Sequence, residues 1–278
     1  AVISTIDADH LVIYGDLQGV QRGFERFIRR ITSDGHLILG PDVNIPSSCN
    51  PGLSRVSYCS PQSDWTLISA VWDGNAYAYA FTFGGKEFSG KLPLGGIHNV
   101  YNAIASIAAS AKLNISIENA ITALSKFPGV KRRFQVITGG EGWTYIDDYA
   151  HHPSEIKALI HGLRNMEPSW PVIVIFQPHL FTRTQMLAKE FGEALSACDQ
   201  VILLPIYPAR EEPIEGVTSA LVAEHIAVPC NTLHNDKEEV LSLVDTLPKG
   251  FVVSAGAGDI SALIPSIRQK LDSTYGKG

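Results

Sequence analysis

The stretch DDYAHHPSEI, residues 147–156, gathers side chains that can do chemistry. It places two adjacent carboxylates, a tyrosine, two adjacent histidines and a proline at a predicted junction between a strand and a helix. The N-terminus of a helix favours a carboxylate and offers free N–H groups to an anion. Asp148 and His151 could therefore share one ligand site at this turn. In the alternative interpretation, an aspartate only caps the helix and the histidines are surface residues.

Polar residues also follow other predicted strands. In open parallel sheets, ligands bind beyond the carboxyl ends of the strands. The ends in question carry residues 147–149, 177–179, 207–210 and 256–259. His179 and Arg183, four residues apart, could project toward a carboxylate or a phosphate, because arginine suits such planar anions. A structural ion pair is the alternative for Arg183.

Three positions earlier in the chain could contact a nucleotide or its metal. His10 lies beside two aspartates in a predicted loop, a set that suits a divalent cation associated with phosphate, although a plain turn fits equally well. Asn99 precedes a helix and could pair with the edge of a base, or only cap the helix. Arg133 ends the basic stretch 131–133, which could meet phosphate or form a solvated face.

The elements that must position these residues change character along the chain. Residues 65–94 alternate with period two around tight turns, which predicts an antiparallel meander. Residues 95–113 and 116–127 have helical patterns. Beyond residues 139–140, nearly all-apolar strands alternate with helices, which predicts a parallel sheet covered on both faces. The change of pattern places a domain boundary near residues 138–142.

Composition excludes several classes of function. The 278 residues carry a formal net charge of -6 with both signs interspersed, which argues against a nonspecific nucleic-acid or anionic-membrane binder. No apolar run is long enough to span a bilayer, and no secretory signal opens the chain. The four cysteines show no metal-ligand spacing and indicate a reducing compartment. We expect a cytoplasmic protein that does not insert into a membrane.

Seven motifs together resemble the Mur ligase family. In chain order they are DADHL, GGIHNVYNA, GVKRRF, DDYAHHPSEI, FQPHLFTRT, YPAREEPIEGVTS and GAGDI. DDYAHHP, FQPH-x-x-x-RT and YPARE are similar to the alanine-adding branch of the family. The resemblance implies an α/β chain with the later part of a central ATPase domain, residues 1–138, which includes the meander. A Rossmann-like C-terminal domain that binds the amino acid, residues 139–278, would follow it.

The resemblance also implies a reaction in the synthesis of peptidoglycan precursors. ATP, with Mg²⁺, would activate the carboxylate of UDP-N-acetylmuramate as an acyl phosphate, which the amine of L-alanine attacks. By motif match, His10 resembles the metal ligand of the family, Asn99 the adenine contact, Arg133 the phosphate contact and Asp148 the ribose contact.

The same motif match implies a set of catalytic residues. Tyr149, His151, His179 and Arg183 resemble the residues that close over the reacting carboxylate and the incoming amino acid.

The sequence departs from the family pattern at three points. No G-x-x-x-x-G-K-[ST] phosphate loop occurs, Val12 stands where the family has Asp, and Leu180 stands where it usually has Arg. We therefore expect a piece of a longer enzyme that does not catalyse ligation by itself. The alternatives are a murein tripeptide ligase and a non-catalytic nucleotide- or peptide-binding module. A nicotinamide-dependent oxidoreductase is disfavoured, because GAGDIS lacks the third glycine of a dinucleotide fingerprint.

Overall fold

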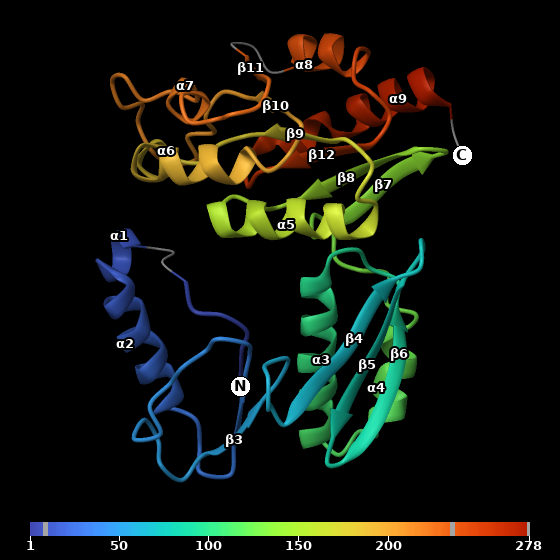
Figure 1. Ribbon diagram of the computed structural model, residues 1–278. Coiled ribbons are helices and arrows are strands. Elements are labelled where there is room, and N and C mark those ends of the chain that lie inside the picture. The colour runs from blue at the N-terminus through green and yellow to red at the C-terminus, as the bar shows by residue number, and fades with distance from the viewer. Residues whose placement is uncertain (8–10, 234–236, 277–278) are drawn as a thin grey trace. The chain divides into compact units, whose positions relative to one another are not determined.

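The computed structural model describes residues 1–7, 11–233 and 237–276, and the chain divides into two compact units (Figure 1). The first unit comprises Ala1–Pro128 and the second Gly129–Gly278. Of the predicted site residues, His10 lies outside the described residues.

The first unit begins with a small parallel sheet. Its strands pair in the order β1-β2-β3, with Val2 opposite Ile38 and His36 opposite Ser54. Helix α2 begins at the N-cap Asp16, whose carboxylate accepts a hydrogen bond from Gly19 N. The elements are β1 (Val2–Ile3), α1 (Leu11–Tyr14), α2 (Leu17–Ile28), β2 (His36–Leu39) and β3 (Ser54–Ser57).

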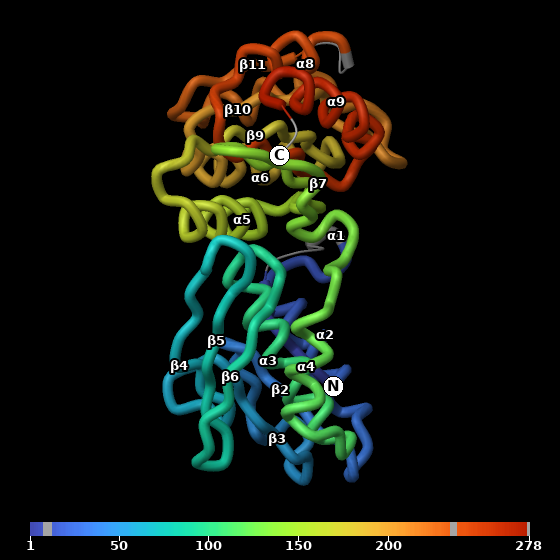
Figure 2. The backbone as a smooth tube through the Cα atoms, turned by 90° about the vertical axis from the view of Figure 1, so that its right-hand side faces the viewer, coloured from blue at the N-terminus to red at the C-terminus, as the bar shows by residue number. Residues whose placement is uncertain are grey.

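The predicted meander is confirmed as three antiparallel strands, β4-β5-β6, which run side by side in Figure 2. An aromatic cluster on this sheet, which includes Trp65 and Phe81, packs against the alanine-rich face of α3. Ser116 caps α4 through its side chain, which accepts a hydrogen bond from Asn119 N. The elements are β4 (Trp65–Trp72), β5 (Tyr77–Phe83), β6 (Lys86–Leu92), α3 (Ile97–Lys112) and α4 (Ile117–Leu124).

The second unit contains the predicted, mostly parallel sheet. Its order is β11-β10-β9-β12-β8-β7, and only β7 is antiparallel to its neighbour among the described strands. The elements are β7 (Gln135–Gly140), β8 (Trp143–Asp148), α5 (Pro153–Met166), β9 (Val172–Phe176), α6 (Phe181–Leu195), β10 (Gln200–Leu203), α7 (Ala220–Ala223), β11 (Cys230–Thr232), α8 (Lys237–Val244), β12 (Phe251–Ala255), η1 (Asp259–Leu263) and α9 (Ile264–Tyr275).

Helices cover both faces of this sheet, as the apolar strands predict. Val172, Val174 and Phe176 of β9 face a core that α5, α6 and α7 complete. Ile173 and Ile175 of the same strand face the opposite core, which α8 and α9 complete. Alternate side chains of a strand point to opposite faces, so an all-apolar strand must be buried on both sides. Figure 1 shows α5 and α9 on opposite sides of the strands.

The two compact units meet at Pro128 and Gly129, before the domain boundary expected at residues 138–142. Those residues lie in and beside the turn between β7 and β8, which pair with Gly140 opposite Trp143. Because this hairpin adds β7 to the sheet of the second unit, the compact unit begins earlier, at Gly129. Within the described part of the chain, none of the helices has the length and apolarity to cross a membrane.

The core beneath α5 gives a stability prediction. Leu159→Ala removes a side chain that is only 2% exposed, so we expect the free energy of unfolding of the second unit to fall by about 2–5 kcal/mol. Hydrogen exchange of the β9 amides measures this quantity. Met186→Ala, at a position that is 55% exposed, is the control and should change it by less than about 1 kcal/mol. Equal losses in the two variants would contradict the assignment of the core.

Candidate functional site

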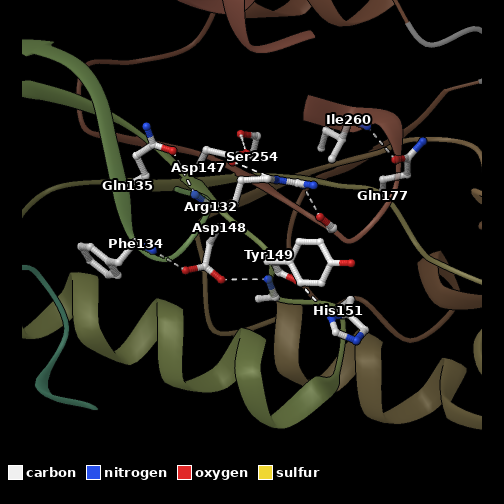
Figure 3. A network of polar contacts seen from close by, with 12 residues as sticks. Arg132, Phe134, Gln135, Asp147, Asp148, Tyr149, His151, Gln177, Ser254 and Ile260 are labelled. Carbon is white, nitrogen blue, oxygen red and sulfur yellow. Dashed lines mark hydrogen bonds and ion pairs between the residues drawn. The ribbon is translucent and has the colours of Figure 1, made fainter. Parts of the chain in front are cut away.

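Strands β8, β12 and β9 end at the same edge of the sheet. Ala255, the last residue of β12, is opposite both Asp148 and Phe176. The residues that follow are linked to each other, because Gln177 Nε2 donates to Asp259 Oδ1 at 2.7 Å and Ile260 N donates to Gln177 Oε1 at 2.9 Å. The polar strand ends that the sequence singles out therefore form one rim, drawn in part in Figure 3.

The chain after β10 reaches the same rim. His179 and Tyr207 form a parallel bridge, and their rings stack with centroids 5.7 Å apart. Gly258 makes the close approach possible, since a Cβ there would lie 2.5 Å from Gln177 Oε1 and 2.6 Å from Tyr207 Cβ. A glycine at this position is therefore required by space, and not by a nucleotide fingerprint.

The two adjacent aspartates point to opposite faces of the sheet, as neighbours on a strand must. Asp147 is completely buried and accepts from Arg132 Nε at 3.2 Å and from Ser254 Oγ at 2.7 Å. Tyr145 donates to the same serine at 3.1 Å, and Arg132 Nη2 donates to Gly256 O. This network, of which Figure 3 labels Arg132, Asp147 and Ser254, ties the segment before β7 to β8 and β12.

Asp148 faces the α5 side of the sheet, and its carboxylate accepts hydrogen bonds from two backbone N–H groups. Its Oδ2 accepts from Phe134 N at 2.6 Å and its Oδ1 from Ala150 N at 2.8 Å. Burial raises the pKa of this carboxyl above its ordinary value, although both hydrogen bonds and the charge of Arg133 act in the opposite direction. Asp148 therefore fixes the turn that carries Tyr149.

Tyr149 lies between two guanidinium groups and a histidine. The Arg132 and Arg133 guanidinium carbons are 5.0 and 5.6 Å from its ring centroid, within the range of a cation–π contact. Tyr149 N donates to Arg132 O at 2.7 Å, so the ring is also fixed through the backbone. The centroid of its phenol ring is 5.3 Å from the centroid of the His151 imidazole ring.

Helix α5 begins with a capping box made by neither aspartate. His152 is the N-cap, Pro153 opens the helix, and Glu155 closes the box. Glu155 Oε2 accepts from His151 N at 2.9 Å and from His152 N at 3.2 Å, while its Oε1 lies 3.7 Å from Arg133 Nη1. One carboxylate thus caps the helix and contacts a predicted phosphate-binding arginine.

His151 and His179 come together from different strand ends, with ring centroids 6.1 Å apart. Burial lowers the pKa of His179, and the positive charges of Arg183 and His151 lower it further, while Glu211 opposes them. His179 Nδ1 is buried and has no hydrogen-bond partner among the described residues. His179 is therefore kept neutral near the cationic Arg183.

The first turn of α6, which carries Arg183, is capped from a distant part of the chain. Leu180 occupies the N-cap in a left-handed conformation, with φ of 71°, and makes no side-chain cap. Glu211 instead accepts from Thr182 N at 3.0 Å and from the Thr182 hydroxyl. Burial raises the pKa of Glu211, but these hydrogen bonds and His179 outweigh it, and the net shift is downward.

Comparison with known proteins identifies the family. The model of the Mur ligase middle domain matches residues 1–110, and that of the Mur ligase glutamate ligase domain matches residues 132–264. The chain belongs to the Mur ligase family. A UDP-N-acetylmuramate--L-alanine ligase from Cytophaga hutchinsonii is 35% identical over the whole chain, which spans 59% of that relative's length.

Solved structures show the same fold. The UDP-N-acetylmuramate-alanine ligase MurC of Thermotoga maritima has a TM-score of 0.74 at 23% identity, covering 98% of this chain and 59% of that one. The MurF ligase of Thermotoga maritima in complex with ADP has a TM-score of 0.78 at 17% identity, covering 98% of this chain and 62% of that one.

The structure gathers most of the site residues that the Mur ligase motifs predict. Arg133, Asp148, Tyr149, His151, His179 and Arg183 belong to the second unit, at or next to the rim. Asn99 belongs to the first unit, in the first turn of α3, where its Nδ2 donates to Gly95 O at 2.7 Å. This contact orients the amide at the start of the helix.

Three residues with structural roles at the site have no assigned role in the sequence reasoning. Arg132 lies in the basic stretch 131–133, whose pattern does not distinguish it from its neighbours, and the partner of Glu211 is 29 positions away, so neither contact can be read from the local sequence. Glu155 could have been found, because proline at the first helical position and glutamate at the third indicate a helix N-terminus.

The rim residues do not include the residue that the motifs predict as a metal ligand. Across residues 1–7, 11–233 and 237–276, no three His, Cys, Asp or Glu side chains are arranged to hold a metal ion. The predicted metal ligand, His10, lies outside these ranges.

The buried network yields a matched pair of substitutions. Arg132→Ala leaves the fully buried Asp147 carboxylate without its cation, and we expect the unfolding free energy of the second unit to fall by about 3–5 kcal/mol. Arg133→Ala removes an exposed, loosely paired neighbour and should cost less than about 1 kcal/mol. Hydrogen exchange of the β8 and β12 amides measures both, and similar costs would argue against a buried anchor.

Asp148 makes stability depend on pH in a defined direction. Its folded-state pKa is raised, so its contribution to stability is complete below the ordinary value of 3.8 and is lost as pH rises through the folded value. The stability of the wild type relative to Asp148→Asn should therefore fall as pH rises through this window. The same hydrogen-exchange measurement at several pH values tests this.

Asp73 is a control of opposite sign. A hydrogen bond from Lys91, with others from the backbone, lowers its pKa to about 2. The stability of the wild type relative to Asp73→Asn should fall as pH decreases from 3.8 toward about 2. The same sign for both variants would contradict the assignment for Asp148.

Proposed function

We propose that this chain forms the nucleotide- and amino-acid-binding part of an ATP-dependent ligase. The enzyme would join L-alanine to the carboxylate of UDP-N-acetylmuramate in the cytoplasmic synthesis of peptidoglycan precursors. The observation that carries the proposal is the rim, where Tyr149, His151 and His179 from two strand ends meet beside Arg133. The named function of the 35% identical relative supports the choice of substrates.

The chemistry requires a carboxylate to be activated before an amine can attack it. ATP would supply a phosphoryl group to form an acyl phosphate, so that phosphate becomes the leaving group in place of hydroxide. Arg133, whose side chain is 54% exposed, can pair with phosphate oxygens by exchanging its 3.7 Å contact with Glu155 for the ligand. The rim then positions the two reacting groups, which accounts for catalysis without a protein nucleophile.

The nucleotide and the amino acid would occupy neighbouring parts of this rim. Asp148 would contact the ribose through acceptor capacity that remains on its carboxylate. For the first unit by itself, we propose that the Asn99 amide contacts adenine. Arg183 would pair with the carboxylate of the amino acid, next to the neutral His179. Mg²⁺, with His10 as a ligand, would neutralise charge on the phosphates.

The absence of a phosphate loop predicts how this chain behaves alone. No G-x-x-x-x-G-K-[ST] occurs in the 278 residues, so the backbone cradle and the lysine that hold a triphosphate are not supplied by this chain. We therefore infer that the chain by itself does not ligate L-alanine.

Phosphate release from ATP tests the proposal. We would assay this chain, and the chain extended by its upstream coding sequence, with UDP-N-acetylmuramate and L-alanine. The expected result is phosphate release and amide product that require L-alanine in the extended chain, with no turnover by this chain alone. Turnover only with the tripeptide L-alanyl-γ-D-glutamyl-diaminopimelate would identify a murein tripeptide ligase instead. Binding without turnover in both would indicate a non-catalytic module.

Substitutions of two arginines should affect the KM values for L-alanine and ATP differently. In the extended chain, Arg183→Ala should raise the KM for L-alanine at least about tenfold more than the KM for ATP, because a charged hydrogen bond contributes about 1.5–3 kcal/mol. Arg133→Ala should do the reverse. Arg268→Ala, at an exposed arginine on α9, is the control and should leave both constants unchanged. Equal effects of the first two variants on both constants would contradict the division of the rim.

A further inference from the structure

The acceptor atoms near His151 determine which of its two ring nitrogens carries a proton. Its Nδ1 lies 2.9 Å from Tyr149 O and 3.3 Å from Glu155 Oε2. A backbone carbonyl can only accept a hydrogen bond, and an ionised carboxylate can only accept one. Nδ1 must therefore carry the proton, and the neutral ring has its lone pair on Nε2.

Glu155 is held in the place where it can act on this ring. Two backbone N–H groups, those of His151 and His152, donate to its Oε2, and its side chain is 34% exposed. The helix cap thus fixes the carboxylate beside Nδ1, and the carboxylate stabilises the positive ring that forms when Nε2 takes a proton. A base whose second nitrogen is oriented by an acceptor is the arrangement that general-base catalysis requires.

The charged and titratable groups around His151 favour it over His179 as the proton acceptor. The neighbouring His179 is 6.1 Å away, and its pKa is lowered first by burial and then by Arg183 and His151. The other neighbours are Tyr149, at 5.3 Å, and the two arginines over the Tyr149 ring. Glu155 Oε2 is 3.3 Å from His151 Nδ1, whereas Glu211 acts on His179 only as the weakest of the charges that set its pKa.

We propose that His151 Nε2 is the general base that removes a proton from the amine of the incoming amino acid, and that Glu155 is its positioning residue. The inference rests on the proposed function. After the ammonium group has lost one proton to Nε2 to give a free amine, its nitrogen forms a bond to the carbonyl carbon. The bond from that carbon to the phosphate oxygen breaks, and phosphate leaves with the electron pair and takes up the second proton that the nitrogen loses as the amide forms. In this account Nε2 accepts the proton that makes the amine nucleophilic and passes it to solvent.

The proton position can be tested on this chain without any substrate. Long-range ¹H–¹⁵N NMR distinguishes the two tautomers of a histidine ring, and His151→Asn assigns the signals. We expect His151 to carry its neutral-state proton on Nδ1. Glu155→Gln keeps an oxygen that can cap the helix but removes the charge, so the titration midpoint of His151 should move to lower pH. A neutral ring protonated on Nε2, or an unchanged midpoint, would overturn the proposal.

The catalytic role can be tested by changing the nucleophile in the extended chain. Hydroxylamine is unprotonated near neutral pH and attacks acyl phosphates without a base, so it reports formation of the acyl phosphate alone. His151→Asn should lower alanine-dependent kcat by about 100-fold or more and leave hydroxamate formation within about threefold of the wild type. Glu155→Gln should lower alanine-dependent kcat about tenfold, with a change in its pH profile.

The control and the outcomes separate this proposal from the proposed function. His161→Asn replaces an exposed histidine on the same helix and should leave both reactions unchanged. Equal losses of amide and hydroxamate in His151→Asn would show a structural role and overturn the base assignment. No hydroxamate from the wild type would instead overturn the proposed function, and the general-base role with it, while the NMR result would still decide the ring geometry.

Discussion

The buried ion pair between Arg132 and Asp147 is the constraint on which the rim depends. Asp147 is fully buried and its salt-bridge partner Arg132 is 21% exposed, so the pair tolerates little displacement. Through Ser254 and Gly256 O, it fixes the end of β12 and the segment before β7 to the end of β8. The rim residues that follow β8 and β12 therefore start from strand ends that this network holds together.

The turn after β8 shows how adjacent residues take different tasks. Strand alternation sends Asp147 to one face and Asp148 to the other, so two like charges do not compete for one site. Asp148 then holds the backbone at Phe134 and Ala150, and the capping box of α5 begins within a few residues. Tyr149 and His151 are therefore presented by two rigid supports, the end of a strand and the start of a helix.

Electrostatics distinguish the two histidines that meet at the rim. His151 has a carboxylate beside its protonated nitrogen, whereas His179 is partly buried and lies near Arg183. Burial and the nearby positive charges lower the pKa of His179, whereas His151 has the Glu155 carboxylate 3.3 Å from its Nδ1.

The sequence by itself determined the local elements and their order along the chain. Period-two alternation predicts the meander, all-apolar strands predict the sheet buried on both faces, and strand-end residues mark the rim. The motifs also point to the Mur ligase family. Each of these signals arises from neighbours within a few residues, where periodicity and turn chemistry act.

Only the tertiary structure decided which residues support the rim. It shows that Arg132 and not Arg133 is the buried partner of Asp147, that Glu211 caps α6 from 29 residues away, and that β7 belongs to the second unit. These outcomes depend on the order and register of the strands. Strand order brings distant residues together through burial and hydrogen bonding, and a local pattern carries no record of those partners.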